Sequence, residues 1–269
     1  MECRLDRITV HYESFGDGRA LVVLPGWPDP GQVPADYLEP AFVGRGGWRR
    51  IYLDLPGRGR TRGESWITSN DQVLEIVLEV IDRLIPGERF VLAGHSAGGY
   101  LARAVLRERA TQIDGLLQVV PVTDDDEAPD RVTLVADDEV IRRIESISDS
   151  ETARQIADAF VVQGPSVYDT FVRLRSSFGA ADRVFLEGLD DRLSRTVDPP
   201  ATPFSKPTLF VLGRQDSVVG YRGAFQLMDA YPRATVAVLD RAGHTLPWEQ
   251  PEVLKALVAE WLDRVEQEA

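Results

Sequence analysis

The fold of this chain is decided by ten residues, Phe90-Val91-Leu92-Ala93-Gly94-His95-Ser96-Ala97-Gly98-Gly99. The run from Phe90 to Ala93 is wholly apolar, which is typical of a strand buried on both faces. The next five residues fit the pattern G-x-S-x-G, and apolar residues at helical spacing follow them. A buried strand, a sharp turn with a central serine and a helix together predict a nucleophilic serine at residue 96.

The glycines of this turn allow the strand and the helix to approach closely, because no Cβ atom stands between them. The turn places the hydroxyl of Ser96 at the carboxyl end of the strand. The backbone amide of Ala97 lies in the first turn of the helix, where it can donate to an oxyanion. We therefore expect Ala97 to supply one donor of an oxyanion hole.

Further strands and helices alternate on both sides of this stretch. An alternating apolar and polar pattern predicts a half-exposed strand over Ile8–Glu13. Apolar runs predict buried strands at 20–24, 48–55, 113–122, 207–213 and 235–239, and helical periodicity predicts helices at 73–84, 101–106, 221–230 and 251–265. Ser69 is expected to begin the first of these helices as its N-cap. This order favours a parallel sheet with right-handed crossovers.

The alternation stops after the strand that ends at residue 122. A polar stretch from 123 to about 203 opens with the acidic run Asp124-Asp125-Asp126-Glu127 and has no pattern typical of a buried strand. Its helical candidates are 137–147, 151–162, 166–177 and 182–194. We predict a core domain of residues 1–122 and 204–269, with a helical cap of residues 123–203 inserted into it. The acidic run is interpreted as a solvated hinge rather than a metal site.

Composition excludes several classes of function. The chain has 269 residues, a net charge of -13 and a pI near 4.8, which argue against nucleic acid or an anionic membrane as the main partner. No apolar run approaches the roughly 20 residues that span a bilayer, and the first residues show no apolar signal segment. The single cysteine, Cys3, excludes an internal disulfide. These features predict a cytoplasmic protein with a small-molecule substrate.

Ser96, Asp216 and His244 each follow a predicted buried strand, and they occur in that order along the chain. The carboxyl ends of parallel strands meet at one edge of the sheet, so the three side chains are expected to converge there. A serine hydroxyl needs a base, and histidine has a pKa near neutral pH. A carboxylate fixes the tautomer of that histidine.

The identity of the acid has alternatives. Asp124 follows the predicted strand that ends at residue 122 and can also reach the histidine, whereas Asp240 is still on its own strand. Asp216 is favoured because it lies in a turn that ends a strand. Of the other two histidines, His11 is interpreted as a strand residue, and His95 as a packing residue behind the site.

The loop Pro25-Gly26-Trp27-Pro28-Asp29-Pro30 follows the predicted strand 20–24 and is too rich in proline and glycine to continue it. The amide of Trp27 is the predicted second oxyanion donor. Asp54 ends another strand and is interpreted as a carboxylate that binds loop amides. The three arginines that follow it, Arg58, Arg60 and Arg62, are expected to be solvated, with one of them possible at the mouth of a pocket.

Taken together, these motifs show that the chain resembles the α/β-hydrolase superfamily over nearly its whole length. The resemblance rests on five segments in order: 24–28, 54–59, 94–99, 212–216 and 242–244. It implies an α/β fold with an eight-stranded, mostly parallel sheet flanked by helices, an antiparallel second strand and a cap after strand six. It also implies a Ser-His-Asp triad. Pro25 stands where many members carry histidine, and prolyl iminopeptidases share this proline, but Ala97 replaces the tryptophan usual in those peptidases.

The resemblance implies a serine hydrolase acting on a small or medium ester-like acyl substrate, without a metal or an organic cofactor. Serine at position 96 argues against haloalkane dehalogenases and epoxide hydrolases, which use aspartate there. A carbon–carbon bond hydrolase, a cofactor-free haloperoxidase-like enzyme, a peptidase or a non-catalytic receptor for a small molecule stay open as alternatives. The oligomeric state is not predicted. Candidates for the pocket lining are the aromatic residues Trp66, Phe160, Phe171, Phe178 and Trp248.

Overall fold

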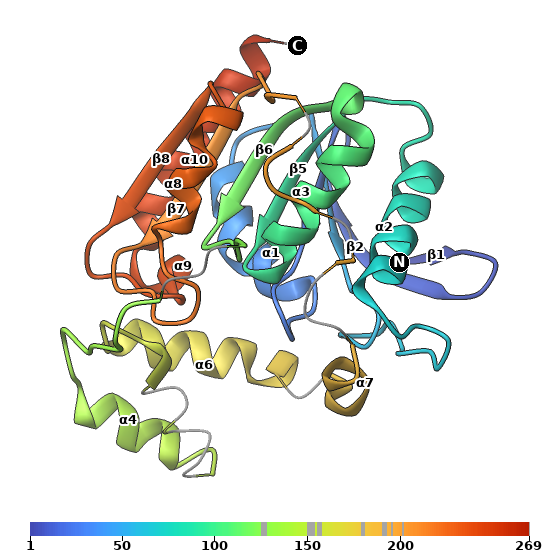
Figure 1. The fold of residues 1–269 in the computed structure, drawn as a ribbon. Coiled ribbons are helices and arrows are strands. Elements are labelled where there is room, and N and C mark those ends of the chain that lie inside the picture. Colours follow the sequence, from blue (N-terminus) through green and yellow to red (C-terminus); the bar gives the residue numbers. More distant parts are fainter. Residues whose placement is uncertain are drawn as a thin grey trace.

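The computed structural model describes residues 1–124, 128–149, 154, 158–178, 181–189, 193–194, 196–200 and 202–268. These residues form an eight-stranded sheet with the order β1-β2-β4-β3-β5-β6-β7-β8 (Figure 1). The strands are β1 (Glu2–Arg4), β2 (Thr9–Phe15), β3 (Arg19–Leu24), β4 (Trp48–Leu53), β5 (Phe90–His95), β6 (Ile113–Val119), β7 (Thr208–Gly213) and β8 (Ala234–Leu239). Strand β5, which ends just before Ser96, lies between β3 and β6, near the middle of the sheet.

Strand β2 runs antiparallel to both of its neighbours, and the pairs from β4 to β8 are all parallel. The expected mostly parallel sheet with an antiparallel second strand is therefore confirmed. Parallel strands need crossover connections, which place helices over both faces of the sheet. This explains why β3, β5, β6 and β7 are apolar and buried along nearly their whole length.

Alternate residues of the central strands enter two separate hydrophobic clusters. Leu92 and Phe210 pack on the face covered by α2 (Asn70–Leu84), α3 (Ala97–Arg109) and α8 (Gly223–Gln226). Val91 and Val211 pack on the opposite face, beneath α1 (Gln32–Leu38) and α10 (Pro251–Gln267). The sheet is thus a rigid layer between two layers of helices, and its carboxyl edge stays available for side chains that carry chemistry.

Several helix boundaries follow from local sequence. Ser69 and Gln72 form a capping box at the start of α2, as the serine in the N-cap position predicts. The predicted helix 221–230 is instead split into the short α8 and a 3₁₀ turn, η3 (Met228–Ala230). Three further short segments were not expected from the sequence: β1, α1 with its 3₁₀ extension η1 (Glu39–Phe42), and α9 (Leu246–Glu249). Another 3₁₀ turn, η2 (Ala110–Gln112), follows α3.

The segment from 123 to 203 supplies α4 (Asp138–Glu145), α6 (Pro165–Phe178) and α7 (Arg183–Glu187). In Figure 1 these helices lie beyond the arrowheads of β5 and β6, at the carboxyl edge of the sheet. Half of the predicted helix 151–162 (residues 151–153 and 155–157) lies outside the described residues, and Val162 forms a bridge to Val135 instead of continuing a helix. The division into core and cap stays a prediction, and we keep the name cap for residues 123–203.

The cap is held to the core by polar contacts at the carboxyl edge. Arg173 of α6 forms an ion pair with Asp36 of α1 at 2.6 Å. Glu249 of α9 accepts hydrogen bonds from the amides of Val161 and Val162. Across the residues that the structure describes, helices of the length and apolarity needed to cross a membrane are absent.

Candidate active site

Ser96 lies between β5 and α3 with φ 52° and ψ -122°, a backbone conformation that few L-residues adopt. Its amide donates to the carbonyl oxygen of Val119 at 3.0 Å, and its own carbonyl oxygen accepts from the amide of Val122 at 3.1 Å. The close approach of α3 to the end of β3 depends on the glycine at position 98. A Cβ atom on Gly98 would lie 2.3 Å from the carbonyl oxygens of Leu24 and Pro25.

The hydroxyl of Ser96 meets the imidazole of His244, with 2.9 Å between Oγ and Nε2. The other ring nitrogen of His244, Nδ1, lies 2.9 Å from Oδ2 of Asp216. Asp216 is completely buried. A buried carboxylate at Nδ1 fixes the tautomer in which Nδ1 carries the proton and Nε2 is free to accept one from the serine. The structure thus brings together the three side chains that the sequence predicts.

Two turns at the carboxyl edge position the acid and the base. Oδ1 of Asp216 accepts from the amides of Val218 and Val219 at 2.9 and 3.0 Å, which orients the carboxylate just after β7. The loop that carries His244 is tied down by Glu249, whose carboxylate accepts from the amide of Gly243 at 2.6 Å. The same glutamate binds the cap through Val161, so the cap and the histidine loop share one anchor.

The other two candidate acids have different surroundings. Asp240 accepts a hydrogen bond from the side chain of Gln215 at 2.9 Å, on the outside of the turn after β8. Asp124 acts electrostatically on Arg103 of α3, but the pKa of that guanidinium, which burial lowers, is raised mainly by its hydrogen bond with Asp198 and only to a smaller extent by Asp124. Asp54 binds loop amides as expected, accepting from Gly31 and Arg60 at 2.9 and 3.0 Å.

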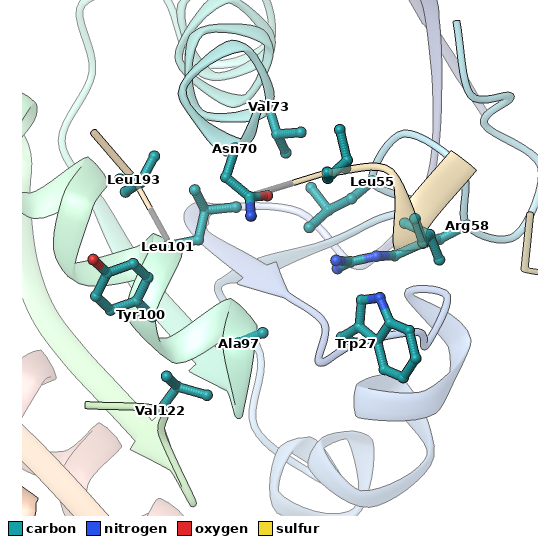
Figure 2. Close-up of a pocket in the computed structure, with 12 residues that line it drawn as sticks. Trp27, Leu55, Arg58, Asn70, Val73, Ala97, Tyr100, Leu101, Val122 and Leu193 are labelled. Atoms are coloured by element: carbon teal, nitrogen blue, oxygen red, sulfur yellow. The ribbon is translucent and has the colours of Figure 1, made fainter. Parts of the chain in front are cut away.

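Trp27 and Ala97 line the same cavity beside Ser96 (Figure 2). Ala97 is the first residue of α3, so its amide is one of those at a helix start that have no acceptor within the helix. Trp27 follows the end of β3, and its indole is 47% exposed. An oxyanion hole requires two backbone amides that point at the position of the oxyanion, next to the nucleophile. This role of Trp27 and Ala97 stays a proposal.

The cavity that contains Trp27 and Ala97 has a volume of about 280 Å³, and we call it the oxyanion-side cavity. Most of its wall is aliphatic and comes from α2, α3 and the cap. Its polar lining includes Arg58 and Asn70. The full lining is Trp27, Leu55, Arg58, Asn70, Val73, Ala97, Tyr100, Leu101, Val122, Leu186, Leu189 and Leu193.

Arg58 is buried rather than solvated, and it lines the oxyanion-side cavity, which agrees with the alternative that one of the three arginines lies at a pocket. Its side chain turns inward below Leu55 and above Trp27 in Figure 2, and the residue is only 7% exposed. Burial lowers the pKa of Arg58 to about 10, although the negative charge of Asp29 opposes this shift. At neutral pH the guanidinium still carries its charge.

A second cavity of about 180 Å³ is lined by His244, His95 and Asp29 among others, and we call it the histidine-side cavity. Phe160, Phe171 and Trp248 line it, as three of the five aromatic candidates predicted. Trp66 instead packs against the hydrophobic core, with the guanidinium of Arg7 over its ring. The side chain of Phe178 lies outside the described residues.

His95 packs behind the site, as the sequence analysis expected. Its ring makes edge contacts with Tyr37 and Trp248 and stacks at 5.8 Å on the ring of His244. Both ring nitrogens are buried and find no hydrogen-bond partner in the described part of the chain. Burial lowers the pKa of His95 to about 3, and the charge of His244 adds to the effect. His95 is therefore neutral at neutral pH.

Asp29 lines the histidine-side cavity and lies in the loop 25–30, where its amide donates to the carbonyl oxygen of Gly26 at 2.9 Å. Burial raises the pKa of its carboxyl to about 6, while the charges of Arg58 and His244 hold it down. Sequence reasoning assigned no role to Asp29. The available signal was its position two residues after the predicted oxyanion donor.

Comparisons of the sequence and the structure with known proteins show what this chain is similar to. The model of the alpha/beta hydrolase family matches residues 21–257. A 2-hydroxy-6-oxononadienedioate/2-hydroxy-6-oxononatrienedioate hydrolase of Cupriavidus pinatubonensis is 25% identical, over 94% of this chain and 90% of that protein. An alpha/beta superfamily hydrolase from Oenococcus oeni superposes with a TM-score of 0.87 at 27% identity, covering 99% of each chain. An esterase from Exiguobacterium antarcticum superposes with a TM-score of 0.73 at 20% identity, over 95% of this chain and 96% of that one.

The matched region begins in β3 and ends within α10, so it contains the serine turn, both loops that follow β7 and β8, and the cap. The superpositions extend the similarity to almost the entire length of the chain. On this evidence the chain belongs to the alpha/beta hydrolase family.

Proposed function

We propose that this chain is a serine hydrolase that cleaves a small or medium ester-like acyl substrate through an acyl-enzyme on Ser96. The observation that supports it is the unbroken series of contacts from the serine hydroxyl through His244 to Asp216, with 2.9 Å at each step. A weak nucleophile becomes reactive when a base of suitable pKa accepts its proton, and this geometry provides that base.

In the proposed reaction, Oγ of Ser96 attacks the carbonyl carbon while its proton moves to Nε2 of His244. The negative charge that develops on the carbonyl oxygen is stabilised by the amides of Trp27 and Ala97. His244 then gives the proton to the leaving alkoxide, and the acyl group stays on the serine. A water molecule, deprotonated by the same histidine, releases the acid and restores the hydroxyl. Asp216 keeps the imidazole oriented throughout.

The two cavities suit this reaction, because an ester has two arms that extend from the carbonyl carbon in different directions. The oxyanion-side cavity is next to Ala97, and the histidine-side cavity is bounded by His244. Both have mostly apolar walls, which favours acyl and alcohol groups of modest size.

A panel of p-nitrophenyl esters from acetate to octanoate tests the proposal. We expect turnover by the wild type and a loss of at least about 10⁴-fold in kcat for both Ser96→Ala and His244→Ala, because the members of a triad act as a unit. Equal rates for the wild type and Ser96→Ala would assign the hydrolysis to another site or to a contaminant.

Hydrolysis of a carbon–carbon bond next to a carbonyl is a second candidate. It is supported by the relative from Cupriavidus pinatubonensis, whose name describes a 2-hydroxy-6-oxononadienedioate hydrolase. The same three residues would serve this reaction. Incubation of the wild type with that dienedioate distinguishes the candidates: rapid loss of its absorbance without turnover of any ester would favour the second.

A further inference from the structure

Arg58 is a buried cation with unused hydrogen-bonding capacity. Its Nη1 donates to the carbonyl oxygens of Pro25 and Gly26, at the long distances of 3.4 and 3.3 Å. Its Nε is buried and has no hydrogen-bond partner among the residues that the structure describes. Within the described part of the chain, carboxylates closer than 4.0 Å to this guanidinium are absent.

A buried guanidinium with an unpaired N–H group destabilises the folded protein unless a further partner accepts a hydrogen bond from it. A buried charge loses its hydration, and this cost is usually offset by an opposite charge and by complete hydrogen bonding. Asp29 acts on Arg58 only at longer range, without an ion pair. Among the residues that the structure describes, the other buried arginine is Arg103, and it is better satisfied because it binds both carboxylate oxygens of Asp198. The charge of Arg58 is therefore placed at the cavity wall with room for a further partner.

The position of that partner is defined by the oxyanion-side cavity. Figure 2 shows the guanidinium of Arg58 turned toward the middle of the cavity, while Ala97 lies across from it. The rest of the wall is largely aliphatic, including Leu55, Leu101 and Leu189. A ligand that suits this wall has an apolar chain with an anion at one end. Arginine binds planar carboxylates especially well, because its N–H groups match the two oxygens.

We propose that Arg58 binds a carboxylate of the substrate, so that the preferred acyl substrates are those with an acid group at the far end, such as monoesters of dicarboxylic acids. This inference rests on the proposed function and adds the substrate class to it. The acyl chain fills the aliphatic part of the oxyanion-side cavity, and the ester carbonyl lies at Ser96.

A purely structural role for Arg58 makes a different prediction. Its bonds to Pro25 and Gly26 brace the loop that carries Trp27, so a bracing role would affect every substrate equally. A carboxylate-binding role affects only substrates that carry the acid.

A matched pair of substrates separates the two roles. Ethyl pentanoate and the monoethyl ester of glutaric acid have the same acyl length and differ only in the terminal carboxylate. We expect the wild type to favour the glutarate monoester in kcat/KM, measured by acid release in a pH-stat. Arg58→Gln should lower kcat/KM for that ester by roughly 10- to 100-fold, mainly through KM, because a hydrogen bond to a charged group is lost. The loss in kcat/KM for ethyl pentanoate should be at least about tenfold smaller than the loss for the glutarate monoester, because that ester has no acid group for Arg58 to bind.

Arg62→Gln is the control, because it removes the same charge from an exposed residue of the same segment. It should leave both substrates unchanged. Arg58→Lys keeps the charge without the planar guanidinium, and it should retain part of the preference for the acid. If Arg58→Gln does not fold, the wild type and Arg58→Lys decide the matter. A wild type without preference for the acid, or equal losses on both esters, overturns the proposal.

Binding to Ser96→Ala tests the inference independently of turnover. By titration calorimetry this variant should bind monoethyl glutarate at least about tenfold more tightly than Ser96→Ala/Arg58→Gln does. If no ester is hydrolysed but this difference is found, the proposed function fails and the carboxylate site stands. If esters are hydrolysed but the two variants bind equally, the carboxylate site fails and the proposed function stands.

Discussion

At the scale of single residues, the site contains a few ionisable side chains that are buried. Three ionisable groups lie near Ser96: Asp29, Arg58 and His95. Burial shifts the pKa of each in the direction that favours the neutral form of the group. Such shifts gather at functional sites, because the same apolar walls that exclude water from a reaction also disfavour charge. None of the three was assigned a chemical role from the sequence.

Asp29 makes the stability of the protein depend on pH in a specific direction. The pKa of its carboxyl is about 6 in the folded chain, against an ordinary value of 3.8. Between these values the unfolded chain loses the proton before the folded chain does, so stability falls as pH rises through this window. Asp29→Asn removes the effect. It should be more stable than the wild type at pH 8 by about 1 to 3 kcal/mol, and the difference should shrink toward pH 4.

Urea unfolding at pH 4, 6 and 8 measures this difference. A variant that is less stable than the wild type at pH 8, or a difference that does not change with pH, would show that the ionised carboxylate of Asp29 is well satisfied in the fold.

Gly98 provides a second residue-scale prediction. Alanine at this position would place its Cβ 2.3 Å from two backbone carbonyl oxygens, at the end of β3 and the start of the oxyanion loop. Neither backbone group can move without displacing α3 or β3. Gly98→Ala should therefore destabilise the fold by about 3 kcal/mol or more and lower hydrolytic activity in whatever protein folds.

Gly46→Ala is the matched control for this substitution, because an added Cβ there has no atom within 4 Å. Chemical denaturation of both variants compares them directly. Similar stabilities for the two would mean that the strand and the helix do not depend on close packing at Gly98.

At the scale of elements, α3 is fixed by one buried arginine. Arg103 is 1% exposed and donates to both carboxylate oxygens of Asp198, to Oε1 of Gln118 on β6, and to the carbonyl oxygen of Val122. These bonds join the helix after Ser96 to the neighbouring strand and to both ends of the cap. The helix that positions the nucleophile and the cap that covers it therefore share one anchor.

Removing only the arginine of the Arg103–Asp198 pair should destabilise the fold. Arg103→Met leaves the carboxylate of Asp198 buried without its partner, and we expect a loss of about 3 to 5 kcal/mol in the free energy of unfolding. The double variant Arg103→Met/Asp198→Leu should recover part of this loss, because no isolated charge remains. Arg142→Met, in the exposed pair with Glu139, is the control and should show no measurable change. A double variant that is less stable than Arg103→Met would contradict this account.

The elements themselves differ in how well the sequence predicts them. The central strands were predicted closely, because burial on both faces leaves an unbroken apolar run such as Phe90–Ala93. The helix after β7 was not, because its fragments α8 and η3 are too short for a periodic pattern. Helix α1 contains Pro34 and follows Gly31, which are signals of a loop, and tertiary packing overrides them.

At the scale of the whole molecule, the order of strands explains the site. The parallel strands bring residues 96, 216 and 244 to one edge, so motifs at strand ends were enough to predict their convergence. The cavities were harder to predict, because their walls come from segments with no fixed spacing: the oxyanion-side cavity combines Leu55, Asn70, Tyr100 and Leu189. Arg58 and Arg62 belong to the same short basic segment, so the sequence does not distinguish them. Only the packed structure shows that Arg58 is buried and that Arg62 is exposed.

Reaction of the whole protein with a fluorophosphonate probe tests the central claim most directly, because phosphonylation requires a serine activated by its base and an accessible cavity. Intact-mass analysis and peptide mapping should show one adduct on Ser96, no adduct in Ser96→Ala, and labelling at least about 100-fold slower in His244→Ala. An unlabelled wild type under conditions that fully label a known serine hydrolase, or an adduct on another residue, would contradict the account.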